Sequence, residues 1–148
     1  MLRVALGITV LLLVLNGLFM LTCISGASMF PTLREGQFAI VFTQAYQFGA
    51  PKRGDVVVVS TPNDLIVKRV VGLPGESLAI HSSNVYVDGQ PLLEPYLKCK
   101  GSWEVGPGRI GAGRYAVVGD NRSGSQANAL LAVVDQNRIL GKLVCAIP

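Results

Sequence analysis

A long uncharged segment at the N-terminus constrains this chain more than any other feature. From Val4 to Ile24 there are 21 consecutive residues without a charged side chain. As an α-helix, which rises about 1.5 Å per residue, this segment would be roughly 30 Å long, the thickness of the hydrocarbon core of a bilayer. We therefore predict a transmembrane anchor over residues 1–24 and a separate domain over residues 25–148. Arg3, before the segment, favours a cytoplasmic N-terminus and an extracytoplasmic domain.

A cleaved leader is the alternative interpretation of this segment. Secretory leaders have an apolar core of about 7–15 residues followed by small residues at the cleavage site, and Ser25-Gly26-Ala27 would serve as such a site. The apolar run is longer than a leader needs. We therefore favour a retained, single-pass anchor in the cell membrane, with the lipid bilayer as a partner of the protein.

Charge and composition argue against two common classes of site. The chain carries 13 Lys and Arg against 9 Asp and Glu, for a formal net charge of +4. These basic residues are scattered, without the clustering that nucleic-acid surfaces show, so we expect no nucleic-acid partner. One histidine and three cysteines cannot supply a zinc site of ordinary ligand spacing. We expect neither a metal nor a cofactor.

The three cysteines leave one question open. Cys99 and Cys145 could form a disulfide in an oxidising compartment, while Cys23 lies at the end of the apolar segment. An odd number of cysteines does not decide between a bonded and a free pair.

After the apolar segment, short runs of apolar and β-branched residues predict an all-β or mixed-β domain. Asp88-Gly89 is a hairpin turn signal, residues 98–113 are expected to form a surface loop, and a helical turn is expected near residues 135–138. The runs that predict strands are Phe38 to Phe42, Val56 to Val59, Leu65 to Leu73, Ser77 to His81, Asn84 to Val87, Tyr115 to Val118 and Leu140 to Ile147.

The pair Lys68-Arg69 lies inside one of these apolar runs. Neighbouring residues of a strand point to opposite faces, so Lys68 shares a face with Ile66 and Val70 while Arg69 lies on the other face. A lysine among apolar side chains has a lowered pKa, because desolvation disfavours the charged ammonium. Such an amine can take a proton from a serine hydroxyl. The alternative is an edge strand with Lys68 in solvent, where it would only hinder aggregation.

Two further segments carry candidate hydroxyl groups. Ser28 follows Gly26 and Ala27, which leave room for a substrate backbone, and Pro31 fixes the chain beyond it. The segment over residues 119–125 contains Asp and Asn, which favour a tight turn, and two serines. Taken singly, each segment is typical of an ordinary surface loop.

Four segments carry more information together than singly. They are Ser28-Met29-Phe30-Pro31-Thr32-Leu33, Arg53-Gly54-Asp55-Val56-Val57-Val58, Lys68-Arg69-Val70-Val71-Gly72-Leu73-Pro74-Gly75-Glu76, and Gly119-Asp120-Asn121-Arg122 with Ser125. In order and spacing they resemble the motifs of type I signal peptidases, the leader peptidase family with a serine/lysine dyad. The resemblance runs from the apolar segment to the last predicted strand, and the segment that begins at Lys68 is the most specific.

The resemblance implies a membrane-bound serine endopeptidase that removes N-terminal signal peptides from exported preproteins. Ser28 would be the nucleophile and Lys68 the general base, with Ser125 orienting the lysine amine. Arg69 and Asp120 would pair and support the site from the opposite face of the strand. The backbone N–H of Ser28 would stabilise the oxyanion. The residues expected around the oxyanion and in the substrate pocket are Gly26, Met29, Ile24, Leu33, Ile66 and Val67.

The chain departs from the family pattern in two places. Some relatives carry a hydroxyl residue, a second oxyanion donor, where this chain has Gly26. Relatives usually continue past Ser125 with an acidic residue, a serine and an arginine, whereas this chain has Ala127, Asn128 and Ala129. The supporting ion pair is therefore missing from these positions.

Other functions stay open from the sequence. A pilin-maturing peptidase of a conjugation system would share the dyad and process one dedicated substrate, and an inactive anchored domain would only bind exported chains. A Ser-His-Asp triad would need His81, the one histidine, which we interpret as an ordinary surface residue. We expect the signal peptides of translocated preproteins as partners and a monomer as the oligomeric state.

Overall fold

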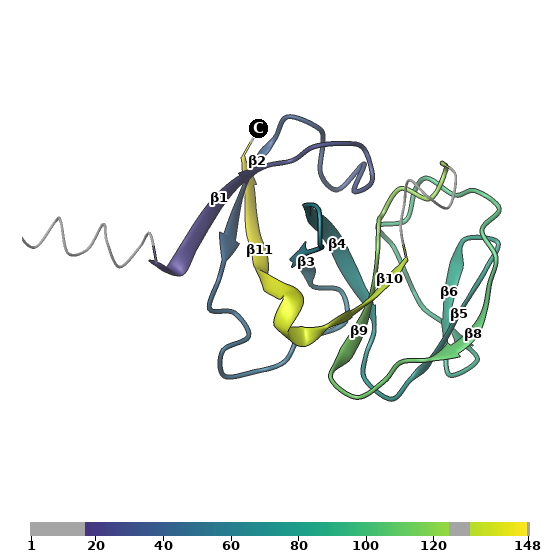
Figure 1. Ribbon diagram of the computed structural model, residues 1–148. Helices are drawn as coiled ribbons and strands as arrows, with labels where there is room; N and C mark the ends of the chain where they lie inside the picture. The colour runs from purple at the N-terminus through teal and green to yellow at the C-terminus, as the bar shows by residue number, and fades with distance from the viewer. Residues whose placement is uncertain (1–16, 125–130, 148) are drawn as a thin grey trace, which may run out of the picture.

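Runs of β-branched residues pair into a seven-stranded antiparallel sheet (Figure 1). The computed structural model describes residues 17–124 and 131–147. Val57, Val58 and Val59 lie in the interior of the sheet and are buried on both faces. In order across the sheet, the strands are β1 (Phe19–Cys23), β2 (Phe38–Phe42), β11 (Ile139–Ile147), β3 (Val56–Ser60), β4 (Leu65–Gly72), β9 (Arg114–Val118) and β10 (Ala132–Asp135).

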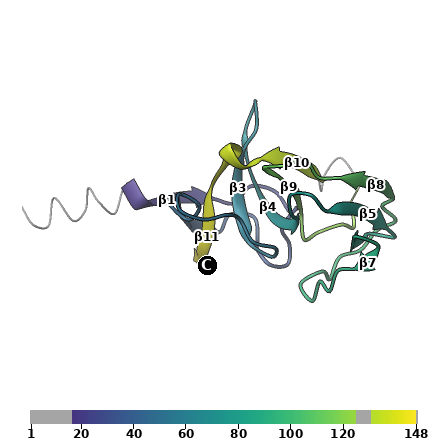
Figure 2. The same cartoon turned by 90° about the horizontal axis from the view of Figure 1, so that it is seen from below.

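A second sheet lies at the end of the molecule opposite β1, as Figures 1 and 2 both show. Its four strands, in order, are β7 (Gln90–Pro91), β6 (Asn84–Val87), β5 (Ser77–His81) and β8 (Val105–Arg109). Asp88 and Gly89, between β6 and β7, both have positive φ (49° and 78°), as the hairpin turn signal requires. The predicted hairpin is confirmed.

The mostly β fold predicted from the sequence is confirmed. Each of the seven predicted runs forms a strand whose ends differ from the prediction by at most one residue. The predicted helical turn is the short 3₁₀ helix η1 (Gln136–Arg138). The surface loop predicted over residues 98–113 is wrong in part, because it contains β8. β8 pairs with β5, and this partner outweighs a local sequence, Val-Gly-Pro-Gly-Arg, that has little tendency to form a strand.

The predicted span from Val4 to Ile24 needs a correction at its C-terminal end. Phe19–Cys23 is the strand β1, which pairs with β2 along all five residues, so the β domain begins before residue 25. Within residues 17–124 and 131–147, no helix is long and apolar enough to cross a membrane. Most of the predicted anchor, residues 1–16, lies outside the described residues. Periodicity failed here because a continuous apolar run fits a buried or membrane helix as well as a strand.

The core is divided into three clusters of apolar side chains. One joins the two sheets around Trp103 and Val71, and a second fills the large sheet around Val57 and Val117. The third packs the segment that contains Ser28 against the sheet. Its buried members are Ile24, Met29, Leu33 and Ala39.

The outer face of β1, β2 and β11 is apolar and exposed. Phe19 and Leu21 alternate with inward side chains along β1, and Leu21 is 63% exposed. Phe38 of β2 lies opposite Ile147 of β11, and both are exposed. Cross-strand partners lie on the same face of a sheet, so these side chains form one surface, which we call the apolar face.

All three cysteines are free. Cys23 and Cys145 are exposed strand residues, and Cys99 lies in an isolated bridge with Asn121. The structure therefore contains no bond between Cys99 and Cys145, the pair that the sequence left open.

Candidate active site

Ser28 and Lys68 lie within hydrogen-bonding distance of one another. Ser28 is in the turn that follows β1, and Lys68 is in β4, with its Nζ 2.7 Å from the Ser28 Oγ. β4 pairs with β3 on one side and β9 on the other, so it is an interior strand. Lys68 is only 5% exposed. The alternative interpretation, an edge strand with Lys68 in solvent, is wrong.

The surroundings of Lys68 disfavour its charged form. Burial lowers the pKa of the Lys68 ammonium below its ordinary value, and the nearby Asp120 carboxylate opposes this shift without cancelling it. Lys68 is paired with Val57 across the β3–β4 ladder, so the base of its side chain lies among apolar groups. An uncharged amine beside a hydroxyl is the arrangement that activates a serine nucleophile.

The loop over residues 119–122 fixes the backbone at Ser28. The Asn121 N–H donates to the Ser28 carbonyl at 2.9 Å, and the Asn121 side-chain amide donates to the Ala27 carbonyl at 3.1 Å. Gly119 packs so closely that a Cβ at this position would collide with the Ser28 carbonyl oxygen. Position 119 therefore requires a glycine because a Cβ has no space there. The backbone conformation does not require one, because the φ of Gly119 is not in the left-handed region.

Replacing Gly119 with alanine tests this contact. We expect Gly119→Ala to push the Ser28 backbone away, which lowers the free energy of unfolding by about 1–3 kcal/mol, the usual cost of overpacking. Gly106→Ala is the matched control, because a Cβ at Gly106 meets no atom within 4 Å. Urea unfolding of both variants measures the difference, and equal stabilities would contradict the proposed contact.

Arg69 and Asp120 pair on the face of β4 opposite Lys68. The guanidinium donates to both carboxylate oxygens, at 2.8 and 2.6 Å, and also to the Gly54 carbonyl at 2.8 Å. Thr32 donates its hydroxyl to Asp120 as well, which links the carboxylate to the segment that follows Ser28. The Arg69 guanidinium is 3.9 Å from the centre of the Tyr96 ring. These contacts tie β4, the 119–122 loop and the Ser28 segment together.

A surface groove of about 680 Å³ opens above Ser28 and Lys68. The Ser28 turn lines it, the turn between β3 and β4 lines it with Thr61, Pro62 and Asn63, and the 119–124 segment adds Asn121 and Ser123. The groove is thus open to solvent and bounded by three segments that are far apart in the sequence.

The predicted pocket residues divide into two groups. Gly26 and Ile66 line the groove. The other four belong to the core cluster beneath the Ser28 segment. They are Ile24, Met29, Leu33 and Val67. Within the described residues, these four are not among those that line the groove, and their role in a substrate pocket stays a prediction. Alternation directs Val67 to the face of β4 opposite Lys68.

The remaining predictions concern Ser125, the positions that follow it, and His81. Ser125, Ala127, Asn128 and Ala129 lie outside the described residues. The His81 ring is exposed and lies 2.7 Å from a carboxylate oxygen of the exposed Glu104, so it takes no part in a Ser-His-Asp arrangement with Ser28.

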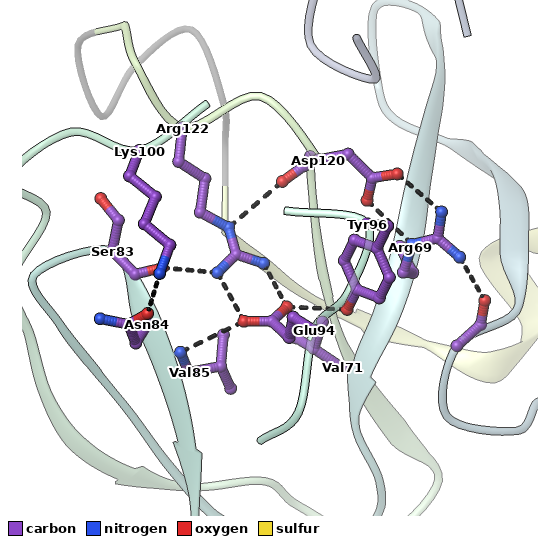
Figure 3. A network of polar contacts seen from close by, with 12 residues as sticks. Arg69, Val71, Ser83, Asn84, Val85, Glu94, Tyr96, Lys100, Asp120 and Arg122 are labelled. Atoms are coloured by element: carbon purple, nitrogen blue, oxygen red, sulfur yellow. Dashed lines mark hydrogen bonds and ion pairs between the residues drawn. The ribbon is translucent and has the colours of Figure 1, made fainter. Parts of the chain in front are cut away.

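A buried ion pair lies next to the Arg69–Asp120 pair (Figure 3). Arg122 is fully buried and donates to both carboxylate oxygens of Glu94. It also donates to the carbonyls of Ser83, at 2.6 Å, and Gly119, at 3.3 Å. Tyr96 donates its hydroxyl to Glu94 at 2.7 Å. The two ion pairs therefore flank Asn121 on either side.

Sequence reasoning did not single out Glu94, Tyr96 or the groove-lining Asn63. A lone glutamate before a proline carries no local signal for burial, and its partner Arg122 is 28 residues away. Only the excess of turn residues at Pro62-Asn63 could have indicated a loop there.

A family model described as "Signal peptidase, peptidase S26" matches residues 1–147. The chain belongs to the signal peptidase family. The resemblance that the four motifs suggested is confirmed.

Several signal peptidases are similar to this chain over most of its length. Signal peptidase I of Leptolyngbya laminosa is 34% identical over 131 residues, which cover 82% of this chain and 64% of that protein. Signal peptidase I of Bacillus amyloliquefaciens is 30% identical, with 93% of this chain and 78% of that protein covered. Signal peptidase IB of Staphylococcus aureus strain COL is 31% identical, with 95% and 84% covered. The chain thus spans slightly less than two thirds of the first of these relatives.

A solved structure supports the fold. The crystal structure of a signal peptidase I from Enterococcus faecalis has a TM-score of 0.53 to this chain at 24% sequence identity. The likeness covers 65% of this chain and 98% of the Enterococcus chain. The β domain described above therefore has the architecture of a signal peptidase.

Proposed function

We propose that this chain is a membrane-anchored serine endopeptidase that removes signal peptides from exported preproteins with a Ser28/Lys68 dyad. The observation that carries the proposal is the 2.7 Å approach of the buried Lys68 Nζ to the Ser28 Oγ at the floor of an open groove. Membership of the signal peptidase family supports the choice of substrate.

In this reaction the neutral Lys68 amine takes the proton of the Ser28 hydroxyl as its oxygen attacks the scissile carbonyl carbon. The C–N bond then breaks, and the Lys68 ammonium gives its proton to the leaving amine. Water then attacks the resulting ester while Lys68 takes a proton from it. The ester C–O bond breaks, and Lys68 gives this proton to the Ser28 oxygen, which releases the new carboxyl end. The backbone N–H of Ser28 is proposed as an oxyanion donor, and Ser125 as the residue that orients the amine.

The bilayer is proposed as the second partner. The apolar face includes β1, the strand formed by the C-terminal part of the uncharged N-terminal segment. An exposed apolar surface of this kind is typical of membrane or protein contact. With the anchor in place, the domain would sit close to the lipid in which the substrate's own apolar segment lies.

An assay of the full chain in detergent micelles tests the proposal. A preprotein with an Ala-x-Ala cleavage site is incubated with the protein, and mass spectrometry identifies the product termini. We expect one cut directly after the second Ala of the site. A pilin precursor in a parallel reaction separates a general peptidase from a dedicated one. Failure to cut either substrate would refute the proposed function.

The pH dependence follows from the state of Lys68. Because burial lowers the pKa of the Lys68 ammonium below 10.5, the amine is free to act as a base at a lower pH than an exposed lysine. We expect kcat/KM to rise with pH through this lowered pKa and to level off before pH 10.5. Between these values the unfolded chain binds a proton that the folded chain does not, so the free energy of unfolding also rises with pH there.

Two measurements check this pH dependence. A pH–rate profile locates the acidic limb of kcat/KM, and urea unfolding of the wild type and of Lys68→Ala at several pH values isolates the contribution of the amine. An acidic limb at the pKa of an exposed lysine would contradict the proposed neutral base.

A further inference from the structure

We propose that Glu94 is a positioning residue for the nucleophile. Through its buried ion pair with Arg122, Glu94 holds the 119–122 loop against the backbone of Ser28. The inference rests on the proposed Ser28 chemistry, and it adds a residue from outside the four motifs to the active site. The chain of contacts runs from Glu94 to Ser28 in three steps. Figure 3 shows the contacts of Glu94 with Arg122 and Tyr96, and the pair of Arg69 with Asp120.

The first step is the contact between the loop and the nucleophile. Asn121 donates to the carbonyls of both Ser28 and Ala27, and Gly119 packs against the Ser28 carbonyl. These contacts fix the peptide groups on both sides of the Ser28 Cα. Any shift of the loop therefore moves the Ser28 Oγ relative to the Lys68 Nζ.

The second step is the hold that Glu94 has on the loop. The side chains of Arg122 and Glu94 are 0% and 3% exposed, so water cannot replace either partner. Arg122 donates to the Gly119 carbonyl, and its backbone N–H donates to the Cys99 carbonyl at 2.8 Å. The guanidinium thus links Arg122, at one end of the loop, to Gly119 at the other. The Glu94 carboxylate neutralises the charge of the guanidinium and fixes its orientation.

The third step closes a ring of contacts around the loop. Tyr96 joins Glu94 through its hydroxyl and lies against the Arg69 guanidinium, which in turn holds Asp120. Asp120 and Arg122 are the two neighbours of Asn121. Asn121, which contacts Ser28, is therefore held through Asp120 by Arg69 of β4, and through Arg122 by Glu94.

The position of Glu94 distinguishes positioning from substrate binding. Glu94 does not line the groove above Ser28 and Lys68, so its loss leaves the substrate contacts in place. A misplacement of reacting groups by about 1 Å can cost on the order of 100-fold in rate. We therefore expect Glu94→Gln to lower kcat by about 10- to 100-fold with KM nearly unchanged.

The experiment compares Glu94→Gln with Glu104→Gln in the full chain in detergent micelles. Glu104 belongs to the same region but is 57% exposed, and its carboxylate contacts only surface groups among the described residues, the His81 ring and the Ser82 N–H. Glu104→Gln should therefore keep the wild-type kcat and KM. Glu94→Asp, which retains the carboxylate, should recover part of the lost kcat. A wild-type kcat for folded Glu94→Gln would overturn the proposal.

Hydrogen exchange gives a second readout that needs no activity. The Asn121 N–H bonds to the Ser28 carbonyl, so its exchange should be about 10-fold faster in Glu94→Gln, while amides in β3 exchange as in the wild type. Faster exchange would support the positioning role even if the wild type proved inactive, an outcome that would refute only the proposed function. Unchanged Asn121 exchange would overturn the inference.

A further variant covers the case in which Glu94→Gln does not fold. Tyr96→Phe removes the hydroxyl bonded to Glu94 but keeps the ring beside Arg69. We expect it to fold and to lose about 3- to 10-fold in kcat at constant KM. Wild-type kcat in both Tyr96→Phe and Glu94→Asp would then overturn the proposal.

Discussion

Ser28→Ala is expected to abolish preprotein cleavage, with a fall in kcat of roughly 10⁴- to 10⁶-fold, the range found when one member of a serine peptidase's catalytic group is removed. The fold should persist, because Asn121 and Gly119 hold the Ser28 backbone, which the substitution leaves in place, and the hydroxyl contacts the Lys68 amine. Lys68→Ala should have an effect of the same size, since Ser28 then has no base within reach. Product formation measured by mass spectrometry, with circular dichroism to verify folding, checks both variants.

Lys68→Arg tests whether position 68 needs a group that can act as a base or only a positive charge. Arginine keeps a cation at this position but cannot be deprotonated in a protein, so it should be as inactive as Lys68→Ala. Lys52→Arg, at an exposed lysine outside the groove, is the matched control and should keep wild-type activity. Substantial activity in Ser28→Ala or in Lys68→Arg would refute the dyad.

Asp120→Ala is expected to destabilise the protein more than any surface change. It leaves the Arg69 guanidinium nearly buried without its carboxylate and removes the acceptor of the Thr32 hydroxyl. Breaking a buried ion pair in this way costs about 3–5 kcal/mol. Cleavage should fall too, because Arg69 would no longer hold the loop that contacts Ser28.

Asp135→Ala is the control for Asp120→Ala. Asp135 also pairs with an arginine, Arg114, but the two side chains are 49% and 54% exposed. An exposed pair contributes about 0–1 kcal/mol. The free energies of unfolding of the two variants, measured by chemical unfolding, should therefore differ by at least about 2 kcal/mol. A similar loss of stability in both would show that the Arg69–Asp120 pair contributes no more to stability than an exposed ion pair.

The strands could be predicted because their signals are local, whereas the Ser28 and Lys68 pair was predicted only from the resemblance of the four motifs to the signal peptidase family. β-branched runs and an Asp-Gly turn predict strands and hairpins from short stretches of sequence. Alternation along β4 predicted that Lys68 and Arg69 face opposite sides, and the structure has Lys68 beside Ser28 and Arg69 beside Asp120.

The remaining features depend on tertiary contacts that no short stretch reveals. β1 was hidden in the apolar segment because the same residues suit a membrane helix and a strand with an apolar outer face. Ile24 and Leu33, which the sequence placed in a substrate pocket, pack in a core cluster with Ala39, a contact between segments that no short stretch could indicate. Glu94 became visible only through a partner 28 residues further along the chain.

β1 also bears on where a substrate can be cut. Five strand residues span about 16 Å, β1 is bonded to β2 along its length, and Ile24 is held to Gln37 by a 2.8 Å hydrogen bond. With the proposed anchor ending before Phe19, this rigid connection would hold the nucleophile at a fixed distance from the anchor. A preprotein anchored in the same bilayer would have to reach the nucleophile across this fixed distance. The length of its segment beyond the membrane, and not only the side chains at the scissile bond, would therefore select the point of cleavage.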